Sequence, residues 1–159
     1  MKKLLSLFSV VVLLMLAGSC KKDDETSLNK TDLLCKAPWK LTAATIDPAF
    51  PMPDFSGNTV SITDFYAQMV DDCSKDDTQK YNSDGTFTFD EGSVKCDSET
   101  PQTSTGTWTF NPDETIITET DPDGSYSYHM IKITENEMQI SEVMPMDGVN
   151  YTITMTMKH

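Results

Sequence analysis

The chain has 159 residues and a formal net charge of −13, because 25 acidic side chains outnumber 12 basic ones, all of them lysine. Without arginine the chain lacks the side chain that binds phosphates and guanine through two hydrogen bonds at once, so we expect no nucleic-acid partner. A chain of this length is enough for one domain with a hydrophobic core and too short for two.

The N-terminus has the pattern of an export signal. Lys2 and Lys3 precede an apolar run over residues 4–16, and small residues then lead to Cys20. The run is shorter than the roughly 20 apolar residues of a membrane-spanning helix, so it predicts a signal peptide over residues 1–19. The small residues before the cysteine resemble the lipobox of bacterial lipoproteins. That resemblance implies cleavage before Cys20 and its acylation with fatty acids such as palmitate.

Residues 20–32 are predicted to be a lipidated cysteine followed by a flexible tether, because this polar segment has no apolar period. The acyl chains would anchor the protein to a membrane. The basic and then acidic cluster at residues 21–25 also resembles an export signal of some Gram-negative lipoproteins, while an ordinary solvated tether would look the same. We therefore expect an outer-membrane anchor, with the domain facing the periplasm or the cell surface.

The first strand of the domain is predicted at residues 39–46. Apolar and polar residues alternate there, which places Trp39, Leu41 and Ala43 on the inward face. The next segment, residues 47–57, contains three prolines and cannot be a central strand. We predict a long surface loop for it.

Apolar residues at helical spacing predict a short amphipathic helix over residues 61–72. Period-two alternation and turn residues such as Asp84-Gly85 then predict seven more strands. These lie at 79–82, 86–90, 105–110, 115–120, 126–134, 137–143 and 150–157. Eight strands with short connections can close into an antiparallel up-and-down barrel, with an open sandwich as the alternative. The sequence thus predicts an all-β domain over residues 33–159, with one helix between its first two strands.

In this strand order the chain resembles the lipocalin-like domains of Gram-negative lipoproteins. The resemblance covers about residues 33–159. It is carried by Pro38-Trp39-Lys40-Leu41, by Tyr81 to Thr86, by the pair Cys73 and Cys96, and by Gly106-Thr107-Trp108-Thr109-Phe110. It implies a lipocalin-like barrel.

The inward apolar side chains are the candidate ligand site. They are Trp39, Leu41, Phe87, Phe89, Trp108, Phe110, Met138, Ile153 and Met155, with Ile140 and Met157 on the same face. In one interpretation they line a pocket for a small hydrophobic ligand, and residues 47–72 form its lid. In the other they fill the barrel, and the acidic rim meets another envelope protein.

An odd number of cysteines remains for disulfides if Cys20 is acylated. We predict a bond between Cys73 and Cys96, which would join the end of the helix to the loop after the Phe87/Phe89 strand. Pairings of either cysteine with Cys35 stay open. Cys35 is otherwise free or available for an intermolecular bond.

The sequence indicates no catalytic, metal or cofactor site. His129 lies within a strand and His159 is the last residue, and no hydrolase, zinc or phosphate-loop motif occurs. Residues 80–91 carry several ligand types of a calcium loop, but Lys80 stands where its first acidic ligand belongs. We therefore expect a protein that is not an enzyme and needs no cofactor or metal.

Overall fold

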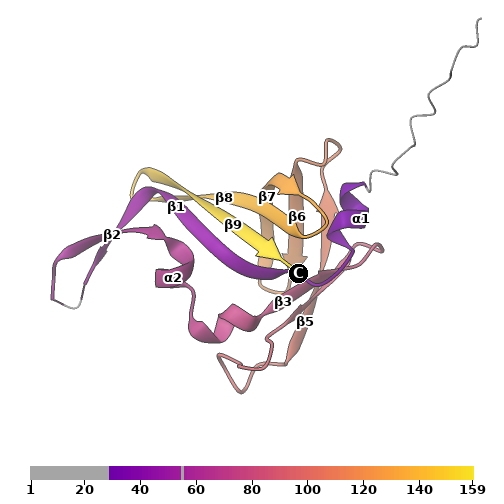
Figure 1. Ribbon diagram of the computed structural model, residues 1–159, viewed down its shortest axis with the longest axis horizontal. Helices are drawn as coiled ribbons and strands as arrows, with labels where there is room; N and C mark the ends of the chain where they lie inside the picture. The colour runs from indigo at the N-terminus through magenta and orange to yellow at the C-terminus, as the bar shows by residue number, and fades with distance from the viewer. Residues whose placement is uncertain (1–28, 55) are drawn as a thin grey trace, which may run out of the picture.

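The structure, a computed structural model, describes residues 29–54 and 56–159. The predicted signal peptide over residues 1–19, the lipidation site Cys20 and most of the predicted tether lie outside the described residues. The described chain is almost entirely β (Figure 1). None of its helices is long and apolar enough to cross a membrane.

Nine strands and three short helices make up the described part of the chain. The strands are β1 (Lys40–Pro53), β2 (Thr59–Asp64), β3 (Thr78–Tyr81), β4 (Thr86–Asp90), β5 (Thr103–Phe110), β6 (Ile116–Asp121), β7 (Gly124–Ile133), β8 (Glu137–Met146) and β9 (Val149–Lys158). The helices are α1 (Lys30–Leu34), α2 (Phe65–Met69) and the 3-10 helix η1 (Asp72–Asp76).

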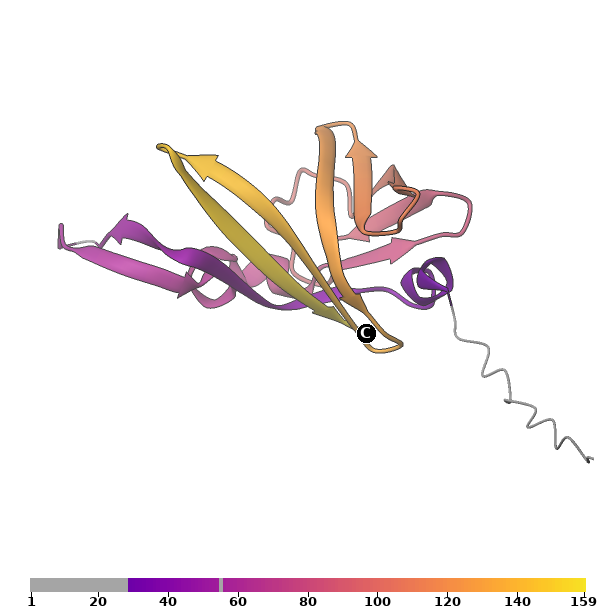
Figure 2. The same cartoon turned by 90° about the horizontal axis from the view of Figure 1, so that it is seen from above.

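All nine strands belong to one antiparallel sheet, in the order β2-β1-β9-β8-β7-β6-β5-β4-β3. From β3 to β9 each strand pairs with the next one along the chain, and β9 then pairs with β1. The strands β3 to β7 curve around one end of the molecule, while β1, β8 and β9 extend away from it as a long ribbon with β2 (Figures 1 and 2). The predicted all-β antiparallel architecture is confirmed.

The predicted closed barrel of eight strands is wrong in strand number and in closure. β2 and β3 are the two edges of the sheet, and between β3 and the start of β1 there is a single bridge, from Trp39 to Gln79. These two residues exchange two backbone hydrogen bonds of 2.8 Å. The ladder does not continue because β3 has only 4 residues and β1 leaves it to pair with β2.

The ninth strand lies where the sequence predicted a helix. Residues 59–64 form β2, and α2 begins only at Phe65, with Asp64 as its N-cap. The Asp64 carboxylate accepts a 2.9 Å hydrogen bond from the Ala67 N–H. The segment Thr59 to Ile62 also alternates with period two and is rich in β-branched residues, so strand pairing with β1 prevails over the helical spacing.

The predicted proline-rich loop over residues 47–57 is also largely wrong, because β1 continues to Pro53. Residues from Phe50 onward pair with β2 alone. A proline has no N–H to donate, and a strand with a neighbour on one side tolerates it. Pro51 and Pro53 lie in this one-sided part, and Pro48 lies where the β1–β2 register is interrupted.

One residue that was predicted to point inward, Ala43, does not do so, because β1 contains a bulge. The register of β1 on β9 shifts between Leu41 and Ala43. One extra residue moves the inward set by one position, so Ala43 is exposed while Ala44 and Ile46 are buried. The alternating sequence alone contains no sign of this shift.

Two hydrophobic clusters hold the fold together. The larger lies in the curved part of the sheet and consists of Leu34, Trp39, Tyr81, Phe87, Trp108, Ile117, Met130, Met138 and Ile140. The smaller stabilises the ribbon and consists of Ile46, Ile62, Tyr151 and Ile153, with Phe50 and Phe65 packed against it. Helix α2 therefore packs on the ribbon through Phe65.

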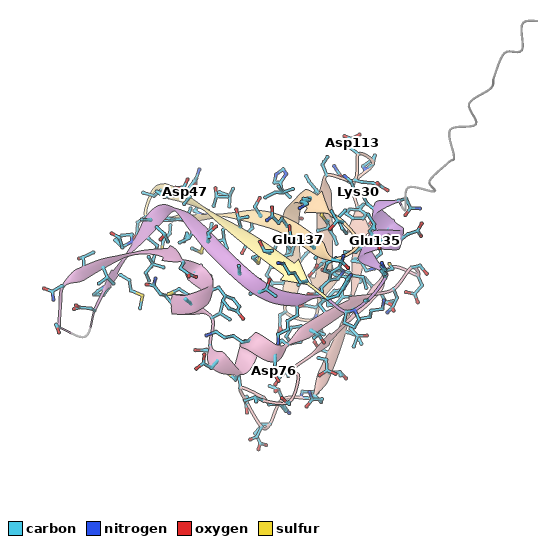
Figure 3. The ribbon with its side chains drawn as sticks, in the orientation of Figure 1. Lys30, Asp47, Asp76, Asp113, Glu135 and Glu137 are labelled. Atoms are coloured by element: carbon cyan, nitrogen blue, oxygen red, sulfur yellow. A yellow bond between two sulfur atoms is a disulfide. The ribbon has the colours of Figure 1, made fainter. Side chains whose placement is uncertain are left out.

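Helix α1 covers one end of the curved part. Its Leu34 is fully buried in the larger cluster. Lys30, labelled in Figure 3, donates a 2.6 Å hydrogen bond to the Glu114 carbonyl in the turn between β5 and β6. Residues 30–32 were predicted to belong to the tether, but they are part of this helix and hence of the domain.

Candidate functional site

A cavity of about 530 Å³ lies within the curved part of the sheet. Aromatic side chains form much of its wall: Phe87 and Phe89 come from β4, and Tyr126 and Tyr128 come from β7. Its volume falls in the range of about 300–1,000 Å³ that is typical of small-molecule sites. The curved part of the sheet therefore carries an open pocket of the size of a small-molecule site.

Gly106 of β5 fixes the position of Phe87. A Cβ atom at this position would lie 2.5 Å from the Phe87 ring and 2.5 Å from the Thr120 carbonyl oxygen. Because glycine has no side chain, the ring packs directly over the backbone of its partner residue in the β4–β5 pair. Phe87 is thus buried in the core and also forms part of the cavity wall.

Four carboxylates line the same cavity: Glu91, Glu119, Asp121 and Asp123. None of the described lining residues is basic, and the ion pairs of the described chain all involve other carboxylates. The cavity is therefore acidic as well as aromatic. The alternation of β6 explains two of the four, since Glu119 and Asp121 follow the buried Ile117 at intervals of two residues.

Glu119 is the most deeply buried of these carboxylates, with 8% of its surface exposed. Its Oε1 atom accepts a hydrogen bond from the hydroxyl of Tyr81, which is itself only 1% exposed. Burial raises the pKa of the Glu119 carboxyl above its usual value. The hydrogen bond from Tyr81 and the nearby Gln79 amide lower that pKa, and the charge of Asp121 raises it further.

We expect Glu119→Gln to stabilise the protein at neutral pH. In the folded wild-type protein the pKa of the Glu119 carboxyl is raised. The free energy of unfolding of the wild type therefore falls as pH rises from the usual pKa of 4.5 through the raised pKa. Glutamine does not ionise and still offers an oxygen to the Tyr81 hydroxyl. Urea unfolding of both proteins at pH 4 and pH 7.5 should show an advantage of the variant that grows with pH. An advantage that is equal at both pH values would contradict this prediction.

Two smaller cavities adjoin the first around Gln79, which lines all three. One of about 120 Å³ shares Glu119 and Tyr128 with the main cavity, and one of about 170 Å³ shares Phe89 with it. The Nε2 atom of Gln79 is occluded and has no hydrogen-bond partner among the described residues. Gln79 therefore places an amide without a partner in the described chain where the three cavities meet.

The predicted ligand residues are distributed over these cavities and the core. Phe87 and Phe89 line the main cavity, and Leu41, Met155 and Trp39 line the smaller ones. The remaining predicted residues pack in the clusters and line none of these three cavities: Trp108, Phe110 and Met138 in the larger cluster, Ile153 in the smaller.

Sequence reasoning missed the polar half of the wall. It assigned no role to Gln79, Glu119, Asp121, Tyr126 or Tyr128. A signal for one of them existed: in residues 115–120 the strand alternates, and Glu119 stands two places after Ile117 on the face that points inward. A carboxylate on an apolar strand face is costly unless it is bonded or functional, which makes it informative.

The predicted lid is not placed over the main cavity. None of the residues that line this cavity lies between residues 47 and 72. Val70 alone of that segment lines the cavity of about 170 Å³. The reason is the additional strand β2, which pairs with β1 and holds the segment against the ribbon instead.

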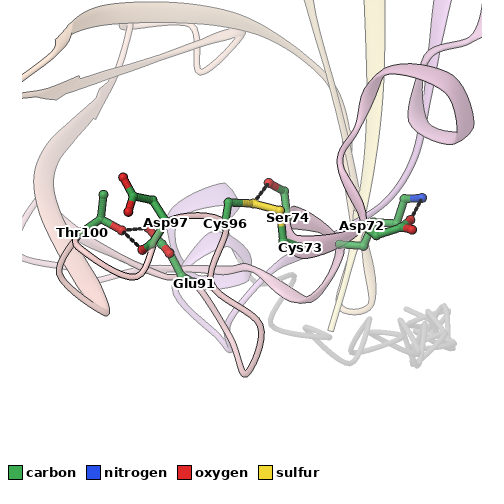
Figure 4. The surroundings of a disulfide bond; sticks show 8 residues. Asp72, Cys73, Ser74, Glu91, Cys96, Asp97 and Thr100 are labelled. Atoms are coloured by element: carbon green, nitrogen blue, oxygen red, sulfur yellow. Dashed lines mark hydrogen bonds and ion pairs between the residues drawn. A yellow bond between two sulfur atoms is a disulfide. The ribbon is translucent and has the colours of Figure 1, made fainter.

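The predicted disulfide between Cys73 and Cys96 is confirmed, with a Cα–Cα distance of 5.1 Å. It joins η1 to the loop between β4 and β5, and Cys35 stands outside any disulfide of the described chain. Figure 4 shows that the same loop brings Thr100 to Glu91, whose carboxylate accepts a 2.9 Å hydrogen bond. Because both residues line the main cavity, the disulfide lies beside the cavity wall.

No group of three or more His, Cys, Asp or Glu side chains in the described residues is arranged to hold a metal ion. His129 is exposed on β7, and His159 packs on Trp39 with ring centroids 3.9 Å apart. The acidic residues 76, 77 and 91 have occluded carboxylate oxygens without partners among the described residues. They do not form a metal-binding group.

In a comparison with protein families, the model of a lipocalin-like domain matches residues 37–140. The matched region begins just before β1 and ends within β8, so it includes every strand that supplies residues to the main cavity. No curated protein matches the chain.

Proposed function

Because the chain belongs to the family of lipocalin-like domains, we propose that it is a non-enzymatic binding protein for a small, largely hydrophobic molecule. The observation that carries this proposal is the cavity of about 530 Å³ in the curved part of the sheet. Aromatic rings on two strands of the sheet, β4 and β7, offer apolar contact area there, and the sheet already holds them in place. A preformed site of this kind needs little ordering when a ligand binds.

Binding is tested by titration with N-phenylnaphthylamine, a neutral apolar fluorophore. We expect saturable fluorescence enhancement that other small apolar molecules reverse. Ser104→Trp should abolish it, because Ser104 lines the cavity and an indole there would fill it. The matched control is Thr105→Trp, one residue along β5, where the side chain points to the opposite face. If the wild-type protein shows no saturable signal, or both variants bind equally well, the cavity is not the binding site.

For the location, we propose that the protein is a lipoprotein, anchored to the outer membrane through acylated Cys20. Support comes from the sequence: the short apolar run, the small residues before the cysteine, and the polar segment after it. The nine residues between Cys20 and Lys30 could span roughly 30 Å if extended. That distance would separate the cavity from the membrane surface.

We expect Cys20→Ser to release the protein from membranes, because the acyl chains supply the anchor. Cys35→Ser is the matched control and should leave the protein in the membrane fraction. Cells fed radiolabelled palmitate should label the wild type and the control but not Cys20→Ser. Label on the Cys20→Ser protein would contradict the proposed anchor.

A further inference from the structure

We propose that the ligand of the main cavity is an organic cation, that is, a protonated amine or guanidine attached to an apolar body. This inference rests on the proposed binding function and specifies the chemical class of its ligand. It depends on the charge of the cavity wall, on how the carboxylates are bonded, and on the aromatic rings beside them.

The charge of the wall is strongly negative. Four of the lining residues are acidic and none of the described ones is basic. The lysines of the described chain that form ion pairs do so with Asp72, Glu135 and Glu137, which lie elsewhere. The negative charge of the cavity is thus left without a protein counterion among the described residues, and a cationic ligand would provide one.

The bonding of the carboxylates leaves acceptors for a ligand. Asp121 Oδ1 accepts hydrogen bonds from the backbone N–H groups of Asp123 and Gly124, at 2.8 and 3.0 Å. Glu91 uses Oε1 for Thr100, while its Oε2 is occluded without a partner among the described residues.

Glu119 provides the deepest acceptor. Tyr81 donates to its Oε1, and the Gln79 amide lies close enough to lower the pKa of this carboxyl, so its neighbours in the described chain are neutral donors. This carboxylate is more than nine-tenths buried and lines both the main cavity and the one of about 120 Å³. A buried carboxylate is unfavourable without a positively charged partner, and an ammonium or guanidinium group would supply charge-assisted donors.

The aromatic rings fit the same ligand class. Phe87, Phe89, Tyr126 and Tyr128 line the cavity together with the carboxylates. The face of an aromatic ring attracts a cation and also packs against an apolar body. A fatty acid or another anionic amphiphile is disfavoured, because its head group would meet four like charges in the wall.

The test compares three probes with one aromatic body and different head groups: 2-naphthylmethylamine, 2-naphthylmethanol and 2-naphthoate. Isothermal titration calorimetry of the full mature chain carrying Cys20→Ser should rank the amine first, on the order of tenfold tighter than the alcohol, with the carboxylate weakest. Added salt should weaken binding of the amine and leave binding of the alcohol unchanged. This salt dependence is measured on the protein without any substitution in the cavity.

Glu119→Gln should weaken binding of the amine on the order of tenfold and change binding of the alcohol much less. The matched control is Glu135→Gln, which removes a carboxylate that is exposed and bonded to Lys36. Equal affinity of amine and alcohol, or an amine affinity that is insensitive both to salt and to Glu119→Gln, would overturn the cation inference and leave the binding function standing. If none of the three probes binds, both proposals fail.

Discussion

Trp39→Ala is expected to lower the free energy of unfolding by about 3–5 kcal/mol, because the indole is fully buried and its removal leaves a large void. The indole N–H also donates a 2.8 Å hydrogen bond to the Leu34 carbonyl. Its loss leaves a buried carbonyl at the C-terminal end of α1 without that donor. Urea unfolding followed by circular dichroism measures the effect.

We expect a large loss of stability in Trp39→Ala because Trp39 connects three parts of the fold. Its side chain bonds to the end of α1 and packs on the ring of His159 at the C-terminus. Its backbone forms the bridge to Gln79, the contact that joins β3 to the start of β1. The variant keeps the backbone bridge but should loosen the packing of α1 and of the C-terminus against the start of β1.

A series of variants separates these contributions. Trp39→Phe keeps most of the apolar area but removes the N–H, so it should cost about 1–3 kcal/mol. His159→Ala removes an exposed ring that packs on Trp39 and lies 3.0 Å from the Pro38 carbonyl through Nδ1, and it should cost less than either change at residue 39. If Trp39→Ala is no more destabilising than His159→Ala, the central role of Trp39 is wrong.

The strand pattern of the sequence predicted most of the sheet because its side chains alternate cleanly. Phe87 and Trp108 are both buried, as expected from strands at 86–90 and 105–110. Alternation indicates which face of a strand is buried, but it does not indicate with which other strand it pairs. The ribbon formed by β1 and β2 depends on such a pairing, and the helical spacing around Phe65 favoured the wrong structure for residues 61–64.

The candidate site was only half predictable for a similar reason. Apolar residues on an inward face are expected in any core, so they indicated Phe87 and Phe89 without distinguishing core from cavity. Glu119 is inward because β6 continues the alternation of Ile117, and it is tolerated because Tyr81 of a distant strand bonds to it. That partner is separated from it by 38 positions, and no local sequence pattern specifies such a pair.

Loss of the disulfide between Cys73 and Cys96 is expected to lower the free energy of unfolding by about 2–4 kcal/mol. The two cysteines are 23 positions apart, and their bond restricts the unfolded chain over that whole segment. The double variant Cys73→Ser with Cys96→Ser measures the effect without a reducing agent. Cys35→Ser is the control, since this residue forms no disulfide in the described chain.

The loss of stability in the double variant should be largest near the missing disulfide, and hydrogen exchange can show where it occurs. Helix η1 has only 5 residues and is too short to persist alone, so the cross-link and a few contacts hold it. Other contacts to the facing loop include two hydrogen bonds that Asp76 accepts from Ser93, at 2.7 and 2.6 Å, and one of 3.3 Å between Ser74 Oγ and Cys96 Sγ. Asp76 is labelled in Figure 3 at the edge of η1. The double variant should lose amide protection first in η1 and in residues 91–102, while β5 to β9 keep theirs.

Because Glu91 and Thr100 of that loop line the main cavity, binding of the apolar fluorophore should weaken in parallel. Uniform loss of protection across the sheet, or an unchanged η1, would show that the disulfide does not hold this side of the cavity in place.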